Sequence, residues 1–379
     1  MIIQTALDMA TKARDIIANE TERLRTQLDA VCLHIHSHPE LCYEETVAHE
    51  TICNFLETNG FSVTRHAYGL PTCFEAEIGT GGAAYHILRR AATELGLAGR
   101  VRLLGTPAEE GGGGKIKLLD AGAFEGAAAA LMSHPTSMNR INEVEGFAGA
   151  AGVVTVAASK LTADFSGRAA HAGATPWQGI DALDAAVGSY VNISVLRQQI
   201  KPAERIHGVI TNGGDVPNII PEKTSMVYAV RSRTATECSD LVRRVKACSE
   251  ASAIATDCQV KVDAPVLYAD QILNPALCED FTEEMILLGE KFLPMAKEAV
   301  SASTDMGNVS HVVPSFHCSY GICSGDASNH TAGFTAAAAT PDALNRAIRV
   351  GKGLAMLGIR LLLDAEFCQS VRFAFEQAK

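Results

Sequence analysis

The chain alternates between stretches with helical spacing of apolar residues and short apolar runs. From Met9 to Val31 apolar residues recur every three or four positions, which predicts a long amphipathic helix that ends before Pro39. The same reading predicts helices over 46–59 and 84–95 and one ending at 119, and strands over 62–66, 72–78, 101–105 and 127–133. Strands that alternate with helices imply a mostly parallel sheet covered by helices, so this part is predicted to be an α/β domain.

The order of elements changes near residue 159. The next predicted elements are a strand, a helix, two paired strands, a helix and a strand, over 161–167, 180–198, 205–211, 224–230, 238–253 and 259–262. This β-α-β-β-α-β order is the ferredoxin-like plan of a small independent domain. Afterwards helices and strands alternate again, up to a long helix over 341–363. The sequence thus predicts a ferredoxin-like α+β domain at 159–268, inserted between a first part (1–158) and a second part (269–379) of the larger domain.

Composition narrows the class of protein. The 379 residues are 47% hydrophobic and 20% charged, a balance typical of globular domains. A formal net charge of −11 and a pI near 5.6 argue against nucleic acid or a membrane surface as partner, and no apolar run reaches spanning length. The eleven cysteines are scattered and form no Cys-x-x-Cys pair, which suits free thiols in a reducing compartment. We therefore expect a soluble cytoplasmic protein.

Two carboxylates follow the predicted strand 101–105, in the segment Thr-Pro-Ala-Glu-Glu-Gly-Gly-Gly-Gly-Lys at 106–115. Adjacent side chains at a strand end point in different directions, so one carboxylate can bind a metal ion while its neighbour polarises a water molecule on that metal. The plain alternative is a solvated acidic turn, because acidic residues are favoured at helix N-termini. Glu109 and Glu110 become a candidate site because matching residues follow them in order.

Two histidines follow predicted strands of the same domain. His134 comes after the apolar run 127–132, and His330 lies in a loop after a strand around 316–322. Ligand sites of α/β sheets gather at the carboxyl ends of strands, so both imidazoles could meet Glu110 there. Each histidine alone is more readily explained as a hydrogen-bonded structural residue. Taken together with the glutamate pair, they predict a metal site.

The inserted domain contributes three further polar candidates. His171 lies in an Ala- and Gly-rich loop, Asn218 lies in Val-Pro-Asn-Ile-Ile-Pro, and Arg231 comes directly after a predicted strand. An arginine at a strand end can bind a carboxylate through two parallel hydrogen bonds. The alternatives are a polar loop residue for His171 and a surface salt bridge for Arg231.

These motifs together resemble the family-20 metallopeptidases, and especially their amidohydrolase branch of aminoacylase-like and dipeptidase-like enzymes. The matching motifs are His-Ser-His-Pro-Glu-Leu at 36–41, Gly-Leu-Pro-Thr at 69–72, Thr-Pro-Ala-Glu-Glu-Gly at 106–111, the His171 loop, Asn-Ile-Ile-Pro at 218–221, Ser-Thr-Asp-Met-Gly-Asn-Val-Ser-His at 303–311 and Asn-His-Thr at 329–331. They cover nearly the whole chain, which makes the resemblance specific.

The resemblance implies a zinc-peptidase-like catalytic domain, split by a dimerisation or lid domain, in a homodimer. It implies hydrolysis of an amide bond in a small substrate with a free carboxylate. The residues to which it assigns roles are Glu109 as general base; Glu110, His134 and His330 as ligands of zinc or another divalent metal; and His171, Asn218 and Arg231 as substrate contacts. His171 would reach the site of the neighbouring subunit.

The chain departs from the family pattern after Ile78. The family has there a further strand that ends in an Asp-Ala-Leu-Pro-like turn, followed by Gly-His-x-Cys-Gly-His, whereas here Gly-Thr-Gly-Gly passes directly to Ala-Ala-Tyr-His86. The residues that would bridge and bind the metals are therefore missing. A catalytic zinc usually has three protein ligands and a water molecule, and on the family pattern neither metal keeps three. An interior strand lost from a sheet also leaves backbone groups without ladder partners unless its neighbours close the gap.

Two functions from different classes are consistent with this sequence. The first is zinc-dependent hydrolysis of a dipeptide or an N-acyl amino acid, which the retained glutamates and histidines favour. The second is a catalytically impaired or inactive relative, acting as a binding or partner protein, or the product of a truncated gene model. The missing segment favours the second function.

Overall fold

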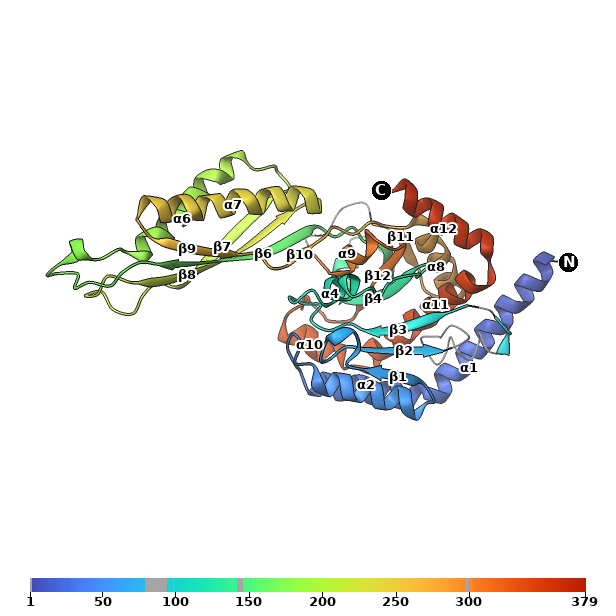
Figure 1. Ribbon diagram of the computed structural model, residues 1–379. Coiled ribbons are helices and arrows are strands. Elements are labelled where there is room, and N and C mark those ends of the chain that lie inside the picture. The colour runs from blue at the N-terminus through green and yellow to red at the C-terminus, as the bar shows by residue number, and fades with distance from the viewer. Residues whose placement is uncertain (1, 79–93, 98, 142–145, 297–299, 301) are drawn as a thin grey trace. The chain divides into compact units, whose positions relative to one another are not determined.

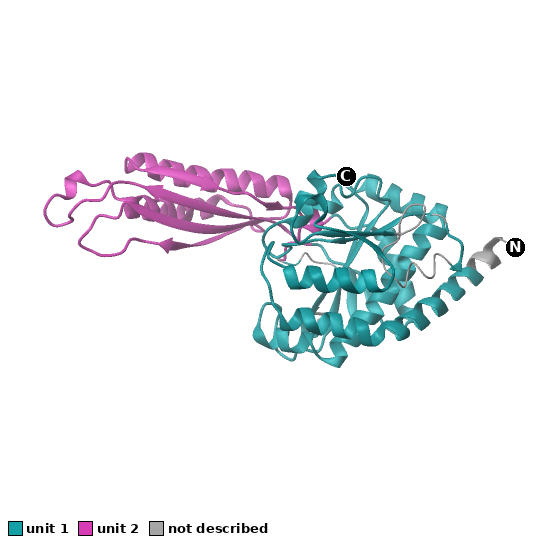
Figure 2. Ribbon diagram, turned by 60° about the horizontal axis from the view of Figure 1, so that its bottom comes forward, with its two compact units in different colours: residues 1–154, 272–300, 308–379 teal, residues 155–271, 301–307 magenta. Residues whose placement is uncertain are grey.

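The structure is a computed structural model that describes residues 2–78, 94–97, 99–141, 146–296, 300 and 302–379. The chain forms two compact units (Figures 1 and 2), of which unit 1 comprises residues 1–154, 272–300 and 308–379, and unit 2 comprises residues 155–271 and 301–307. The predicted α/β class with an inserted α+β part is confirmed. No helix among the described residues is both long and apolar enough to cross a membrane.

Two long helices from opposite ends of the chain pack together in unit 1. α1 (Ile2–Ser37) buries Ala13 and Ile17 against Met356 and Ile359 of α11 (Pro341–Leu363). The other described helices of unit 1 are α2 (Thr46–Thr58), η1 (Ala67–Gly69), α4 (Gly114–Asp120), α5 (Met138–Ile141), α8 (Pro275–Leu287), α10 (Ala332–Ala338) and α12 (Ala365–Gln377). The short helix α9 (Met306–Ser310) begins in unit 2 and ends in unit 1. α12, which follows α11 almost directly, was not predicted from the apolar pattern.

A three-stranded antiparallel sheet lies in the first part of unit 1. Its strands are β1 (Ser62–Arg65), β2 (Phe74–Ile78) and β3 (Val101–Gly105), in the order β1-β2-β3. α2 packs on this sheet, because its Cys53 and Leu56 form an apolar cluster with Phe74 and Leu103. The helix predicted over 84–95 falls almost wholly outside the described residues.

A separate four-stranded sheet forms the rest of unit 1. Its strands are β4 (Ala130–Ser137), β5 (Gly149–Gly152), β11 (Phe292–Met295) and β12 (Ser315–Ile322), in the order β11-β5-β12-β4. β12 runs parallel to β4 and antiparallel to β5, and β5 runs parallel to β11. The expectation of a mostly parallel sheet is therefore corrected to mixed pairing. One reason is that β1 and β2 are close enough in sequence to pair as antiparallel neighbours without a crossover helix.

Unit 2 has the predicted ferredoxin-like order of elements. They are β6 (Ala157–Ser166), η2 (Pro176–Gln178), α6 (Ala182–Leu196), η3 (Arg197–Gln199), β7 (Arg205–Asn212), β8 (Lys223–Ser232), α7 (Ala235–Ala255), β9 (Gln259–Asp263) and β10 (Leu267–Tyr268). The antiparallel sheet has the order β10-β6-β8-β7, and β9 also pairs with β6. Side chains of α6 and α7 pack with Phe165 and Tyr228 of the sheet in one apolar core.

Candidate active site

The loop between β3 and α4 forms a tight turn, in which Ala108 has a left-handed backbone conformation. Ala108 lies in the left-handed region with φ +57°, and its carbonyl oxygen accepts hydrogen bonds from the backbone N–H groups of Gly112 and Gly113 at 2.9 and 3.0 Å. A Cβ atom on Gly114 would lie 1.8 Å from the carbonyl oxygen of Pro107, so only glycine fits there. The glycines thus permit a compact turn that presents Glu109 and Glu110 between β3 and α4.

Glu45, at the start of α2, holds this loop through both carboxylate oxygens. The backbone N–H of Ala108 donates to Oε1 of Glu45 at 2.8 Å, and the hydroxyl of Thr72 donates to Oε2 at 2.9 Å. Ala108 is 4% exposed, so its N–H has little access to water and depends on this acceptor. Glu45 was not among the predicted site residues. Its only signal was an acidic residue immediately before a predicted helix.

Glu110 and His330 come together although they lie far apart in sequence. Nε2 of His330 is 4.0 Å from Oε2 of Glu110. The two side chains are 74% and 66% exposed, so they form an open pair at the surface of unit 1, whereas Glu109 is half-buried. The structure therefore brings together two of the three predicted metal ligands.

The loop of His330 is fixed by its neighbour Asn329. The side-chain oxygen of Asn329 accepts hydrogen bonds from Thr136 Oγ1 and the backbone N–H of Ser137, and its amide nitrogen donates to the carbonyl oxygen of Pro135. His330 itself has φ +64°, a left-handed conformation that costs free energy for a residue with a Cβ. Asn329 thus anchors a strained residue to the end of β4. Asn329 belongs to the Asn-His-Thr motif, but the motif alone predicted no role for it.

His134 does not lie at a strand end, which corrects the prediction. It lies within β4, opposite Ser319 of β12, because the strand continues to Ser137. Pro135 does not end the strand, since proline is tolerated on an edge strand and β4 pairs only with β12 among the described residues. The His134 ring lies 6.2 Å from that of His317, whose burial, with smaller effects of His134 and Lys115, lowers its pKa to about 3.

In unit 2, His171 and Asn218 are neighbours but Arg231 is distant from both. His171 forms an isolated bridge with Ile219, and the backbone N–H of Ala172 donates to the carbonyl oxygen of Asn218 at 3.0 Å. Asn218 and Ile219 lie just before β8, which begins at Lys223, whereas Arg231 lies near the other end of that strand. Eight residues of β-strand span roughly 26 Å. One small substrate therefore cannot touch both groups within a single chain.

The histidines at the end of α1 make local contacts. Nδ1 of His38 lies 2.8 Å from the carbonyl oxygen of His34, and Nε2 of His36 lies 2.8 Å from the carbonyl oxygen of Thr335. His36 thereby ties α1 to α10, the helix that follows His330.

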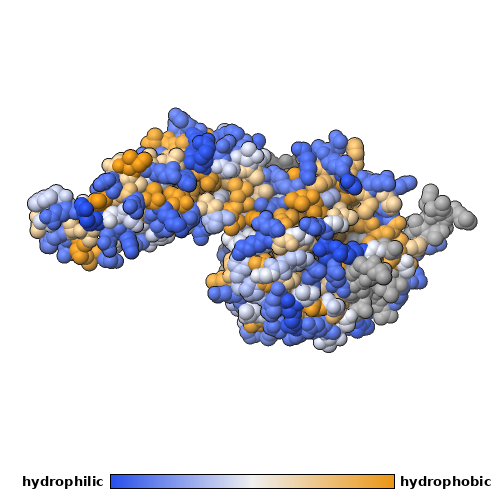
Figure 3. Space-filling view, viewed as in Figure 1, coloured by the Kyte–Doolittle hydropathy of each residue, from blue (hydrophilic) through white to orange (hydrophobic). Residues whose placement is uncertain are grey.

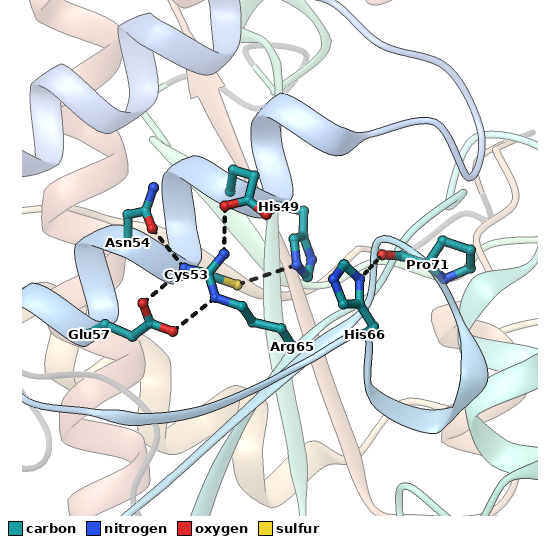
Figure 4. Close-up of polar contacts among 8 residues, drawn as sticks. His49, Cys53, Asn54, Glu57, Arg65, His66 and Pro71 are labelled. Carbon is teal, nitrogen blue, oxygen red and sulfur yellow. Dashed lines mark hydrogen bonds and ion pairs between the residues drawn. The ribbon is translucent and has the colours of Figure 1, made fainter.

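A further polar cluster joins α2 to β1 (Figure 4). The ring of His49 stacks on that of His66 with centroids 4.7 Å apart, and its Nε2 lies 3.8 Å from Sγ of Cys53. Burial raises the pKa of Cys53 to about 11, so the thiol is protonated at neutral pH. Arg65 forms ion pairs with Glu50 and Glu57 beside it. The cluster therefore packs a helix onto a strand.

Comparison with known proteins agrees with the motifs. The family model described as Peptidase family M20/M25/M40 matches residues 72–356. A Mus musculus protein named Xaa-Arg dipeptidase is 37% identical over 95% of this chain and 91% of its own length, and a Homo sapiens protein of the same name is 35% identical over 92% and 89%. A crystal structure of a dinuclear metal-binding M20 peptidase from Bacillus subtilis has a similar fold, with a TM-score of 0.58, 18% identity and coverage of 89% of this chain and 99% of that one.

The mouse relative contains residues that this chain lacks. The aligned region extends over 406 residues, which exceeds the 379 residues of the whole chain. At least one segment of the relative therefore has no counterpart here.

The described residues do not fit a pair of metal ions of the kind that the Bacillus subtilis structure binds. Among them, no group of three or more His, Cys, Asp or Glu side chains is arranged to hold a metal ion. Glu110 and His330 form an exposed pair, and His134 lies inside β4 next to His317. A catalytic zinc normally has three protein ligands. Two ligands in open solvent fall short of that number, so we derive no catalytic step through a metal.

Proposed function

Because the chain belongs to the peptidase family M20/M25/M40, whose members hydrolyse peptide or amide C–N bonds, we propose that it acts on a dipeptide or an N-acyl amino acid with zinc as its metal. The observation that carries this proposal is the match of motifs and relatives along nearly the whole chain. The mouse and human relatives are named Xaa-Arg dipeptidases, so a dipeptide with a carboxyl-terminal arginine is the first substrate to test.

Glu109 is the proposed general base in this reaction. It is half-buried in a loop that Glu45 and the glycines constrain, so its backbone is held in a defined place. A carboxylate in that position can take a proton from the attacking water and deliver it to the leaving amine. Glu110, with His330 beside it, supplies negative charge and donor atoms next to this base.

Arg231 and His171 are the proposed substrate contacts of unit 2. Arg231 would bind the free carboxylate, since a guanidinium matches a carboxylate with two parallel hydrogen bonds. His171 and Asn218 lie roughly 26 Å away along β8, by the rise of a strand. Both groups can therefore serve one small substrate only if His171 comes from a second subunit, which supports a homodimer.

The surface of unit 2 offers an apolar face for that dimer. Exposed apolar side chains repeat along α6, and two more lie on the edge strand β7. They are Val187, Tyr190, Val191 and Val195 on α6 and Val209 and Ile210 on β7. Figure 3 shows hydrophobic patches on unit 2. A charged residue in place of Val191 should shift the chain to a monomer in sedimentation measurements, and the same change at exposed Ile254 on α7 is the control.

The alternative function is that of a catalytically impaired relative, and the lack of a three-ligand group among the described residues favours it. Elemental analysis of the zinc-supplemented chain, combined with hydrolysis of Xaa-Arg dipeptides, separates the two. Hydrolysis that Glu109→Ala abolishes while the zinc content is unchanged would support the proposed reaction. A folded chain that binds no zinc and hydrolyses nothing would leave the alternative.

A further inference from the structure

One face of the sheet in unit 2 carries a group of basic side chains. Figure 1 shows α6 and α7 on the same side of this sheet, and the strand residues that point toward these helices form the buried core. Successive side chains of a strand point to opposite faces, so the residues between the buried positions lie on the face without helices. The basic residues of that face, here called the basic cluster, are Lys160, Arg205, His207 and Arg231.

The register of the strands places the basic cluster in two adjacent rows. Arg205 of β7 lies directly opposite Arg231 of β8. In the next row, His207 of β7 and Lys160 of β6 lie on the two sides of Ala229 of β8. The two rows are roughly 7 Å apart along the strands, and β6 and β7 are roughly 10 Å apart across β8.

The pairing of Arg205 with Arg231 runs against the electrostatics of a sheet. Like charges directly opposite each other on paired strands are destabilising. The chain as a whole is acidic, with a formal net charge of −11, so the cluster does not follow from the composition. Among the strand residues of this face, the nearest acid by register is Asp263, one row beyond Lys160, and it pairs with Lys261 instead. A local conflict of this kind is typical of a functional site, where a ligand offsets the repulsion.

The backbone next to Arg205 holds its side chain at one nitrogen. Nη1 of Arg205 donates to the carbonyl oxygens of Pro202 and Glu204 at 2.5 and 2.7 Å. A guanidinium has N–H groups on three nitrogens, and two parallel N–H groups match one carboxylate. Arg205 is exposed, and so are Lys160 and His207, whereas Arg231 is half-buried. The cluster therefore combines an oriented arginine with access from the solvent.

We propose that the basic cluster binds a small dicarboxylate. One carboxylate accepts hydrogen bonds in the row of Arg205 and Arg231, and the other lies in the row of Lys160 and His207. A single carboxylate reaches only one of these rows, because they are roughly 7 Å apart. Two arginines and a lysine also carry more positive charge than one carboxylate neutralises. The bound dicarboxylate offsets the repulsion between the paired arginines.

This inference goes beyond the proposed function and shares one residue with it. Arg231 is the proposed contact of the free carboxylate of the substrate, so a dicarboxylate in the cluster competes with the substrate. The competition rests on the proposed function, but the binding of the dicarboxylate does not. Two sources supply the same chemistry, namely a free dicarboxylic acid and a dipeptide whose carboxyl-terminal residue is acidic.

Calorimetric titration of the full chain with glutarate and with pentanoate tests the site. Both acids have an unbranched chain of the same length, but pentanoate has one carboxylate only. Glutarate should bind at least ~10-fold more tightly, because its second carboxylate adds charge-assisted hydrogen bonds. Equal affinities of the two acids, or no binding of glutarate, would overturn the proposal.

Matched variants test the location of the site. Arg205→Gln and Lys160→Gln, one in each row, should each weaken glutarate binding at least ~10-fold, because each removes a charged donor. Lys223→Gln removes the same charge from the same face of β8, at a distance of roughly 26 Å from Arg231, and should leave the affinity unchanged. An equal loss in Lys223→Gln would mean that only the net charge matters and would overturn the site.

Competition with dipeptides identifies the source of the ligand. Displacement of glutarate by Ala-Glu, at concentrations where Ala-Gln has no effect, supports the site and makes an acidic carboxyl-terminal residue the source. Glutarate that Ala-Glu does not displace supports the site with a free dicarboxylic acid as its ligand. Ala-Arg that binds together with glutarate would count against the proposed role of Arg231 in the reaction, and the dicarboxylate site would stand.

Discussion

The described strands of unit 2 form one sheet, whereas those of unit 1 form two. In unit 2 the central strands β6 and β8 have partners on both sides, and one apolar core joins the sheet to α6 and α7. In unit 1 the strands fall into two sheets, and the buried residues divide among four separate clusters. Both units follow the same rules of apolar patterning. The difference shows that a pattern which specifies each strand does not ensure that the strands close into one sheet.

Both units bury polar groups together with hydrogen-bond partners. In unit 2 the hydroxyls of Ser189 and Ser249 pair at 2.8 Å, and the buried carboxylate of Glu204 accepts a hydrogen bond from the backbone N–H of Lys201. In unit 1 the carboxylate of Glu284 on α8 is 8% exposed and accepts two-pronged hydrogen bonds from Arg14 on α1. The Arg14–Glu284 pair joins two helices and stabilises unit 1 only while both partners are present.

The largest expected difference concerns core truncation. Phe165→Ala in unit 2 should lower the free energy of unfolding by about 3–5 kcal/mol, because the ring is 1% exposed in a closed core. Leu103→Ala on the half-buried strand β3 should cost less than about 2 kcal/mol. Urea denaturation of both variants checks this prediction. Equal costs would mean that β3 is as well packed as the core of unit 2.

Hydrogen exchange should order the strands in the same way. Amides of β6 and β8 are expected to exchange at least ~100-fold more slowly than those of β3, because strands with two partners open only in larger unfolding events. Exchange of the unmodified chain, followed strand by strand, gives the comparison directly. Similar exchange rates in β3 and β8 would contradict the placement of β3 at the edge of its sheet.

The buried acid Asp280 on α8 should make unit 1 sensitive to pH. Burial raises the pKa of the Asp280 carboxyl to about 6, although Arg360 nearby opposes this effect. The folded state then binds the proton more tightly than the unfolded state, so this contribution to stability is lost as the pH rises from about 4 to 6. The loss amounts to about 3 kcal/mol, because the pKa is raised from 3.8 to about 6 and one pKa unit corresponds to about 1.4 kcal/mol.

Asp280→Asn should flatten that part of the pH dependence of unfolding. Asp240→Asn on α7 is the matched control, because the Asp240 side chain is 70% exposed and its change should leave the profile as it is. A wild-type profile retained in Asp280→Asn would refute the assignment.

The smallest expected effect concerns the loop of the glutamate pair. Glu45→Gln keeps one acceptor oxygen and should cost about 1 kcal/mol, because either the Ala108 N–H or the Thr72 hydroxyl loses its partner. Glu44→Gln, at an exposed neighbouring position, should be neutral. Thermal unfolding of both variants measures the difference, and equal melting temperatures would show that Glu45 does not hold the loop.

Much of the fold could be predicted because it depends on local patterns. The long helix α11 was predicted with its observed bounds, and the ferredoxin-like order of unit 2 was also predicted, since apolar spacing and turn residues are local signals. The position of His134 was predicted wrongly, because the length of β4 depends on its ladder with β12. Glu45 and Asn329 were overlooked as anchors, because their partners lie elsewhere in the sequence.

By itself the sequence determined the α/β class, the inserted unit, the family and the candidate residues, all of which can be read from spacing and ordered motifs. Only the tertiary structure decided which of these residues meet. It paired Glu110 with His330, placed His134 inside a strand, and separated Arg231 from His171 along β8. It also showed that the described strands of unit 1 form two sheets. The physical reason is that strand pairing and ligand geometry arise between residues far apart in sequence, and no local pattern records whether every partner is present.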